Sequence, residues 1–183
     1  MTTSLETLHA LRQTLPGQQT RGLDDAVIER FLALDPRLSQ AIGEAAELQE
    51  RVLARFPMLR TSEVEAIRVI QDGYVNFYAS GAVNPYVALA ARGPWVVTLH
   101  GAVIHDSGGY GMLGFGHNPP EVLEAMARPQ VMANIMTANG AQLDLDQHLR
   151  CELGHAREHG CPFDRFLCMN SGSEAMTLSL IHI

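Results

Sequence analysis

Residues 166–175 read Phe-Leu-Cys-Met-Asn-Ser-Gly-Ser-Glu-Ala, and the expected architecture follows from this segment. The segment from Phe163 to Met169, in which apolar residues alternate with Asp164 and Arg165, is typical of a buried β-strand. Residues 170–173 are typical of a turn, and Glu174 of the beginning of a helix. The first amides of a helix lack intrahelical acceptors, and the helix dipole places partial positive charge beside them. A strand that leads through Ser-Gly-Ser into a helix is therefore a suitable site for a phosphate group.

Three consecutive residues would make the phosphate contacts. Gly172 lets the backbone approach an anion without a side chain in the way, and Ser171 and Ser173 add hydroxyl donors. The alternative is an ordinary helix N-cap, in which one of the serines accepts a hydrogen bond from its own helix. The Ser-Gly-Ser tripeptide alone does not decide between these two interpretations.

Two sequence blocks together resemble the class III pyridoxal-phosphate-dependent aminotransferases. Residues 170–175 resemble the family's Asn-Ser-Gly-(Ser/Thr)-Glu-Ala signature. Residues 116–122, Gly-His-Asn-Pro-Pro-Glu-Val, resemble its Gly-His-x-x-Pro-x-Val segment. The blocks occur in the family's order and at about its spacing, and the resemblance covers roughly 93–177.

The resemblance implies an α/β fold of type I, with a mostly parallel sheet flanked by helices and an active site shared across a homodimer. It divides the chain into a helical segment at 1–92 and the first part of the cofactor-binding large domain at 93–177. Ser171, Gly172 and Ser173 would bind the phosphate of pyridoxal 5'-phosphate through backbone amides and the Ser173 hydroxyl. Tyr110 corresponds to a turn that borders the substrate in the family.

The same resemblance leaves the catalytic residues outside this chain. The family's Schiff-base lysine, the aspartate that pairs with the pyridinium nitrogen and the aromatic ring that stacks on the cofactor all lie further downstream. All 13 basic residues are arginine, so the chain contains no lysine. We therefore expect the intact enzyme to transfer an amino group from an amine or amino acid to a 2-oxo acid, and this fragment alone to be inactive.

The last six residues depart from the family pattern. Leu178–Ile183 reads Leu-Ser-Leu-Ile-His-Ile, where a family member continues with a helix rich in small residues. One reading frame of a common sequencing-transposon adaptor encodes the same hexapeptide. We expect 178–183 to be a non-native tail that closes a truncated reading frame, with a natural ending as the alternative.

The composition indicates a folded, acidic protein. Hydrophobic residues make up 46% of the chain, and the net charge of −7 argues against a surface for duplex nucleic acid. Three cysteines cannot all pair within one chain, which favours a reducing compartment. We expect no secretory signal, because Met1–Gly17 lacks a basic region followed by an apolar run. No run approaches the roughly 18 apolar residues of a membrane span. A soluble cytoplasmic protein is the expectation.

The first ninety residues carry four helix-period patterns. The first includes Leu5 and ends at Pro16, and the second begins at Asp24 or Asp25 and ends near Pro36. The third spans about 38–56. A capping box formed by Thr61 or Ser62 with Glu65 begins the fourth. We interpret these helices as scaffold rather than site.

Further elements follow after Gly93-Pro94. Residues 95–99 and 102–105 are expected to form a hairpin around Gly101. Pro119 and Pro120 are expected to open a helix that Pro129 ends, and another helix is expected from Ala141 to His159.

Two other motifs compete with the aminotransferase reading. Residues 109–114 satisfy the dinucleotide pattern G-x-G-x-x-G, but the prolines that follow would break the required helix. Cys151, His155, His159 and Cys161 place zinc-type ligands close together, yet a single helix does not converge on one ion, so we predict no metal site. A non-catalytic helical module is the main alternative function, and a dinucleotide-dependent oxidoreductase is the third.

Overall fold

The computed structural model describes residues 3–75, 79, 86–107, 114–131, 137–169 and 171–181. The chain divides into two compact units, Met1–Arg128 and Pro129–Ile183, which we call the first and the second unit.

The first unit begins with the four predicted helices. They are α1 (Ser4–Thr14), α2 (Asp25–Leu32), α3 (Pro36–Arg55) and α4 (Glu63–Gln71), with a short 3₁₀ turn, η1 (Pro57–Leu59), before α4. The residues just before the first turn determine where these helices begin.

Capping side chains fix three of these starts. Thr3 and Glu6 form a reciprocal capping box on α1. The Asp35 carboxylate accepts from the amide of Arg37 at the start of α3, and Ser62 caps α4. The four predicted helices are confirmed. The capping box predicted at α4 forms only in part, because the Ser62 hydroxyl accepts from the amide of Glu65 but the Glu65 carboxylate binds Arg68.

An antiparallel sheet follows, in the order β1 (Ala88–Arg92), β2 (Trp95–Thr98) and β3 (Val103–His105). The predicted hairpin is confirmed, with Trp95 opposite His105 and Val97 opposite Val103. Strand β1 was not predicted, because Ala-Leu-Ala-Ala-Arg lacks the β-branched and aromatic residues typical of strands. The described residues thus form a mixed helical and β structure whose sheet is antiparallel, not the mostly parallel sheet that the resemblance implies.

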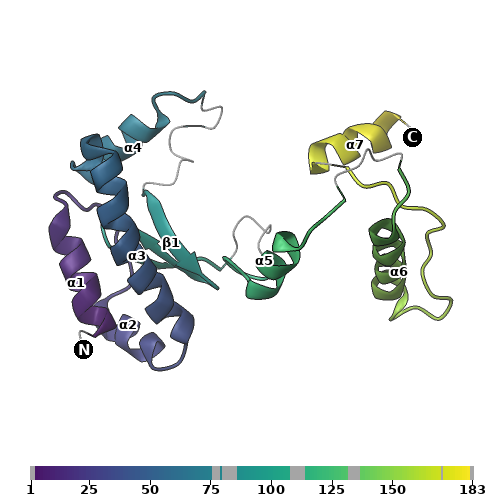
Figure 1. Ribbon diagram of the computed structural model, residues 1–183, viewed down its shortest axis with the longest axis horizontal. Helices are drawn as coiled ribbons and strands as arrows, with labels where there is room; N and C mark the ends of the chain where they lie inside the picture. Colours follow the sequence, from purple (N-terminus) through teal and green to yellow (C-terminus); the bar gives the residue numbers. More distant parts are fainter. Residues whose placement is uncertain are drawn as a thin grey trace. The chain divides into compact units, whose positions relative to one another are not determined.

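The core of the first unit lies between the sheet and the helices. Helix α3 runs along the sheet and contacts β1, β2 and α1 (Figure 1). One cluster of buried side chains joins these elements: Leu8, Leu11, Ile28, Leu38, Ala41, Ile42, Ala45, Ala90, Trp95, Val97 and Val103. The buried Gln49 amide donates to the carbonyl oxygens of Leu11 and Leu99 at 3.2 and 2.8 Å. Helix α3 is therefore tied to α1 and to the end of β2 by polar as well as apolar contacts.

The boundary expected at 92/93 falls within the turn that joins β1 to β2. Because α3 packs on both of these strands, the helical segment and the beginning of the 93–177 region share one core. The division between compact units comes after Arg128. Helix α5 (Pro120–Ala127), predicted from its prolines, is confirmed and is the last helix of the first unit.

The second unit contains α6 (Gly140–Gly154) and α7 (Gly172–Ile181). A reciprocal capping box between Asn139 and Gln142 begins α6. The helix ends at Gly154, five residues before the predicted end at His159. A Cβ atom on Gly154 would lie 2.6 Å from the amide nitrogen of Cys161, so the returning chain packs directly on this glycine.

The strand predicted at Phe163–Met169 is wrong. This segment lacks regular secondary structure, and Phe163, Leu167 and Met169 are exposed by 52%, 67% and 42%. A strand needs a neighbour for its backbone groups, and no strand of the described residues pairs with it. Arg150 of α6 holds its beginning instead, donating to the carbonyl oxygens of Phe163 and Asp164 at 3.1 and 2.7 Å.

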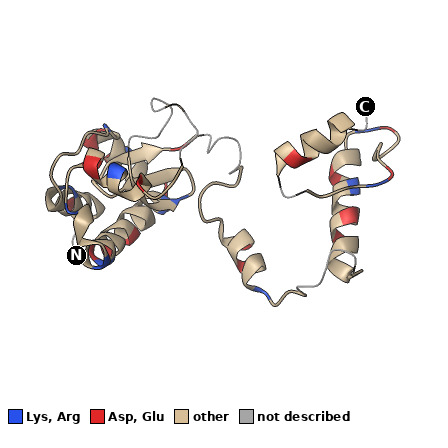
Figure 2. Ribbon diagram, turned by 90° about the horizontal axis from the view of Figure 1, so that it is seen from above, with Lys and Arg blue, Asp and Glu red and all other residues tan. Residues whose placement is uncertain are grey.

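Acidic and basic side chains are interspersed along the elements of both units (Figure 2). Ion pairs between neighbouring turns of one helix, such as Glu65 with Arg68 and Asp146 with Arg150, account for part of this pattern. Among the helices of the described residues, none combines the length and the apolar character needed to cross a membrane.

Candidate functional site

The predicted phosphate-binding loop lies at the beginning of α7. The Ser171 hydroxyl accepts from the amide of Glu174 at 3.2 Å, and the Glu174 carboxylate accepts from the amide of Ser171 at 3.1 Å. This is a reciprocal capping box, so Ser171 plays the N-cap role of the alternative interpretation. The helix begins at Gly172, two residues before the predicted start at Glu174. Asn170 lies outside the described residues.

Gly172 and Ser173 occupy the first two positions of α7. A helix leaves the amides at these positions without intrahelical acceptors. A Cβ atom on Gly172 would meet nothing within 4 Å, so space beside it is open to a ligand. Ser173 is exposed, and its hydroxyl has no hydrogen-bond partner among the residues that the structure describes. Two amides and one hydroxyl are therefore available, and these donors fit a phosphate group.

Tyr110, predicted to border the substrate, lies outside the described residues, as do the first glycines of the G-x-G-x-x-G pattern. The neighbouring block at 116–122 is described. Gly93 and His117 exchange two backbone hydrogen bonds, of 2.9 and 2.7 Å, in an isolated antiparallel bridge. Gly116 has φ +78°, and a Cβ atom there would lie 2.9 Å from the backbone of Gly93. The block can therefore approach the β1–β2 turn this closely because position 116 is glycine.

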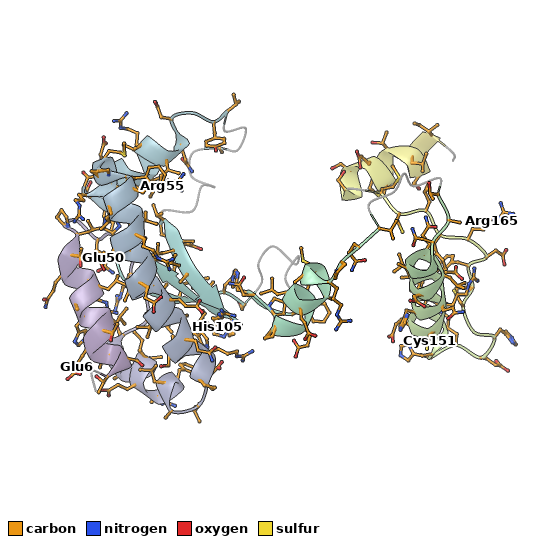
Figure 3. All side chains as sticks on the ribbon, in the orientation of Figure 1. Glu6, Glu50, Arg55, His105, Cys151 and Arg165 are labelled. Carbon is orange, nitrogen blue, oxygen red and sulfur yellow. The ribbon has the colours of Figure 1, made fainter. Side chains whose placement is uncertain are left out.

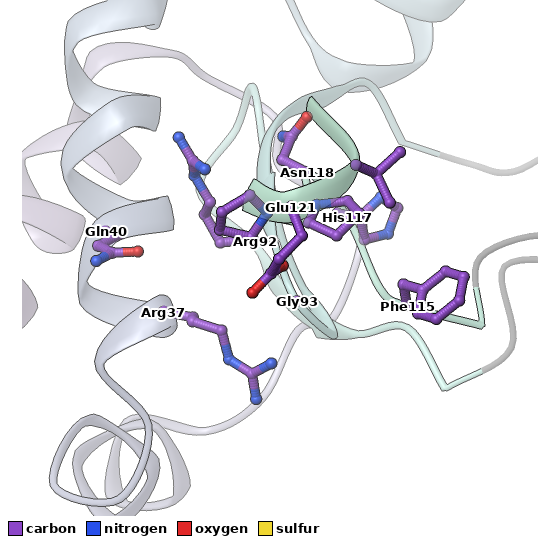
Figure 4. Close-up of a pocket in the computed structure, with 11 residues that line it drawn as sticks. Arg37, Gln40, Arg92, Gly93, Phe115, His117, Asn118 and Glu121 are labelled. Carbon is purple, nitrogen blue, oxygen red and sulfur yellow. The ribbon is translucent and has the colours of Figure 1, made fainter. Parts of the chain in front are cut away.

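A groove of about 450 Å³ lies beside this bridge (Figure 4). Arg37 and Gln40 reach it from α3, and Asn118 and Glu121 reach it from the start of α5. Its remaining lining residues are Arg92, Gly93, Phe115, His117, Pro119, Pro120 and Val122. The groove thus combines charged groups with apolar and aromatic walls.

Both arginines of the groove are held by carboxylates. Arg37 donates through Nε and Nη2 to Asp35 at 2.9 Å each, and the Trp95 indole donates to the same carboxylate at 2.8 Å. Arg92 donates through Nε and Nη2 to Glu44 at 2.9 and 2.6 Å.

These pairings shift the pKa values of Asp35, Arg37 and Arg92. The Arg37 guanidinium lowers the pKa of Asp35 to about 2, and Glu44 raises the pKa of Arg92. Asp35, Arg37 and Arg92 therefore stay charged at neutral pH. Sequence reasoning missed them, since Arg37 and Arg92 are 55 positions apart and no motif links them.

The zinc-type residues are spread over α6 and the turns that follow it. Cys151 is an exposed residue of α6 (Figure 3), whereas His155 is the C-cap and His159 lies beyond the helix. The His155 ring contacts the carbonyl oxygen of Glu152, and the Cys161 thiol donates to the carbonyl oxygen of Phe163. Within the described part of the chain, no three His, Cys, Asp or Glu side chains gather as a metal site would require. The absence of zinc stays a prediction.

Comparisons with protein-family models, with curated proteins and with solved structures gave no match to this chain.

Proposed function

We propose that the intact protein is a class III aminotransferase that uses pyridoxal 5'-phosphate, and that this chain contributes its phosphate-binding loop. The observation that carries the proposal is the Asn-Ser-Gly-Ser-Glu-Ala block with a helix that begins at its glycine. The second block at 116–122 supports it by its order and spacing. The fold of type I, the homodimer and the cytoplasmic location belong to the same proposal.

The residues of the loop have separate roles in this proposal. The amides of Gly172 and Ser173 and the Ser173 hydroxyl would hold the phosphate, assisted by the positive end of the α7 dipole. Ser171 and Glu174 fix the first turn through their reciprocal hydrogen bonds. The bound cofactor supplies an electron sink for moving an amino group from an amine or amino acid to a 2-oxo acid. Tyr110 is proposed to border the substrate.

The chain by itself should not perform this reaction. It contains no lysine, so its amino terminus is the only primary amine that could attach to the cofactor covalently. Phosphate contacts alone contribute about 1.5–3 kcal/mol each. Association costs an estimated 4–15 kcal/mol of lost freedom, which offsets much of that gain. We therefore expect weak, reversible binding and no turnover.

The test compares pyridoxal 5'-phosphate with pyridoxal, which lacks the phosphate, by calorimetric titration of the chain. Ser173→Ala should weaken binding of the phosphate form by about fivefold or more, because a charge-assisted hydrogen bond is lost. Ser179→Ala, on the same helix, is the matched control. Equal binding of both compounds, or no effect of Ser173→Ala, would reject the loop as a phosphate site.

Borohydride reduction gives a second measurement. Any cofactor that becomes covalently attached should be found at Met1 only, by peptide mass mapping. Attachment at an internal residue, or turnover of an amino donor, would show that the account of this chain is wrong.

A non-catalytic helical module is the second candidate, and the capping box of Ser171 and Glu174 favours it. In that case the Ser-Gly-Ser segment does no more than begin α7. The two candidates differ in the titration: in the module, Ser173→Ala should leave the binding of the cofactor unchanged.

A further inference from the structure

We propose that the groove between α3 and the start of α5 binds a small ligand with an oxyanion, a carboxylate or a phosphate, attached to an apolar body. The groove belongs to the first unit and shares no residue with 171–173. The inference therefore does not rest on the proposed function.

The two guanidinium groups supply donors in fixed positions. Asp35 and Glu44 bind the Nε and Nη2 atoms of Arg37 and Arg92, which leaves the Nη1 atom of each without a partner among the described residues. Because each guanidinium is already held, a ligand would restrict little further side-chain motion. Guanidinium groups bind carboxylates and phosphates through such directed N–H bonds.

Gly93 places the Arg37 guanidinium against the floor of the groove. A Cβ atom at this position would lie 2.9 Å from the Cζ, Nε and Nη1 atoms of Arg37. Any side chain here would displace the guanidinium, and the positive φ of Gly93 also favours glycine. Because Gly93 has no side chain, the Arg37 guanidinium can lie directly beside the groove.

The start of α5 adds further donors and an apolar wall. Pro119 and Pro120 carry no amide hydrogen, so the amides of Glu121 and Val122 are the ones that this helix leaves without intrahelical acceptors. The positive end of the helix dipole lies at the same edge. Phe115, Val122 and the two prolines line the remainder, and a volume of about 450 Å³ is within the range of small-molecule sites.

One group of the groove opposes an anion. The Glu121 carboxylate lines the groove and has no cationic partner among the described residues. Since Asp35 and Glu44 balance the two arginines, attraction for an oxyanion comes from local hydrogen bonds rather than from net charge. Removal of the Glu121 charge should therefore strengthen binding, an effect that a merely structural role of this exposed residue would not produce.

The experiment titrates the full chain with phenyl phosphate, benzoate and benzylamine, which present a phosphate, a carboxylate and an ammonium on one aromatic body. Calorimetry measures affinity. The indole N–H of Trp95, the single tryptophan, reports local binding by NMR because it donates to the carboxylate that holds Arg37. We expect phenyl phosphate or benzoate to bind and benzylamine not to bind, and the better anion identifies the head group.

Two matched pairs of variants test the residues. Arg92→Gln should weaken anion binding about tenfold or more, since a charge-assisted hydrogen bond is lost. Arg68→Gln, which removes another carboxylate-paired arginine, should leave it unchanged. Glu121→Gln should tighten binding, whereas Glu124→Gln, on the same helix, should not. Ser173→Ala should leave the response of the Trp95 indole N–H to phenyl phosphate unchanged, which separates this groove from the loop of α7.

Binding of benzylamine as tight as that of the anions would overturn the proposal, as would equal effects of Arg92→Gln and Arg68→Gln. Should Arg92→Gln fail to fold because Glu44 loses its partner, the Glu121→Gln titration decides. Weaker anion binding, or unchanged binding, in that variant would also overturn the proposal.

Discussion

The two units of this chain are built from similar local signals but differ in what they bury. Helices of both units begin with capping boxes, as Thr3–Glu6 and Asn139–Gln142 show. Among the described residues, however, every buried apolar side chain lies in the first unit. In the second unit the only buried residue of the described part is Gly154. Local sequence therefore suffices for a helix, whereas a core requires a second surface against which its apolar face can pack.

Helix α7 shows this difference most clearly. Its sequence contains Met176, Leu180 and Ile181, each exposed by more than 60%. The helix has no buried residue, and its apolar side chains are distributed around it rather than along one stripe. In α3, by contrast, Leu38, Ile42 and Ala45 lie on the face that meets the sheet.

The largest expected effect comes from paired core and surface truncations. Ile42→Ala should lower the free energy of unfolding by about 2–5 kcal/mol, because it leaves a cavity among fully buried side chains. Leu167→Ala, in the second unit, should change it by less than about 0.5 kcal/mol. Urea unfolding followed by circular dichroism measures both. Similar losses would mean that Leu167 is buried in solution and that the contrast between the units fails.

A paired glycine replacement sharpens the comparison inside the first unit. Gly116→Ala should cost about 2 kcal/mol or more, since φ is +78° and the new Cβ atom would meet the backbone of Gly93. Gly114→Ala, where a Cβ atom would meet nothing within 4 Å, is the control. Thermal unfolding of the two variants gives the difference. An unperturbed Gly116→Ala protein would contradict the close approach of this block to the β1–β2 turn.

Acid unfolding separates a paired carboxylate of the first unit from an exposed one of the second. The pKa of Asp35 is lowered in the folded protein to about 2 from 3.8. Its stabilising contribution is therefore complete above about pH 4 and is lost as the pH falls toward 2. Asp35→Asn should cost on the order of 1–2 kcal/mol at pH 7, and the gap to the unmodified protein should close in that window. Asp144→Asn, at an exposed carboxylate of α6, is the control; a constant gap for Asp35→Asn would refute this pairing.

The smallest effect on global stability is expected for Arg150→Gln. This arginine contacts Asp146, Phe163 and Asp164, but its side chain is 39% exposed, so solvent screens its ion pair and the loss of stability should be small. Amide hydrogen exchange should nevertheless accelerate at 163–166, because the variant removes the hydrogen bonds from Arg150 to Phe163 and Asp164. Arg157→Gln is the matched control in the same unit. Cooperative unfolding of the whole second unit in Arg150→Gln would instead show that the fold of this unit depends on the contacts of this one side chain.

The sequence predicted the elements whose signals are local. The four N-terminal helices, the 95–105 hairpin and α5 follow from caps, prolines, β-branched residues and helical spacing. Strand β1 was not predicted because its alanines have no strand preference. It forms because its backbone pairs with the edge of β2. The prediction for 163–169 was wrong for the opposite reason. The composition of this segment suits a strand, but no strand among the described residues lies beside it to pair with its backbone.

For the candidate site, the sequence by itself determined the position of the Ser-Gly-Ser segment at a helix start and the absence of any lysine. These depend on residue identity and on contacts within four positions. Only the tertiary structure decided that Arg37 and Arg92 line one groove and that Gly116 lets its backbone segment meet the β1–β2 turn. The physical reason is that such groups are brought together by packing between distant segments, and no local pattern of residues encodes which buried surfaces will meet.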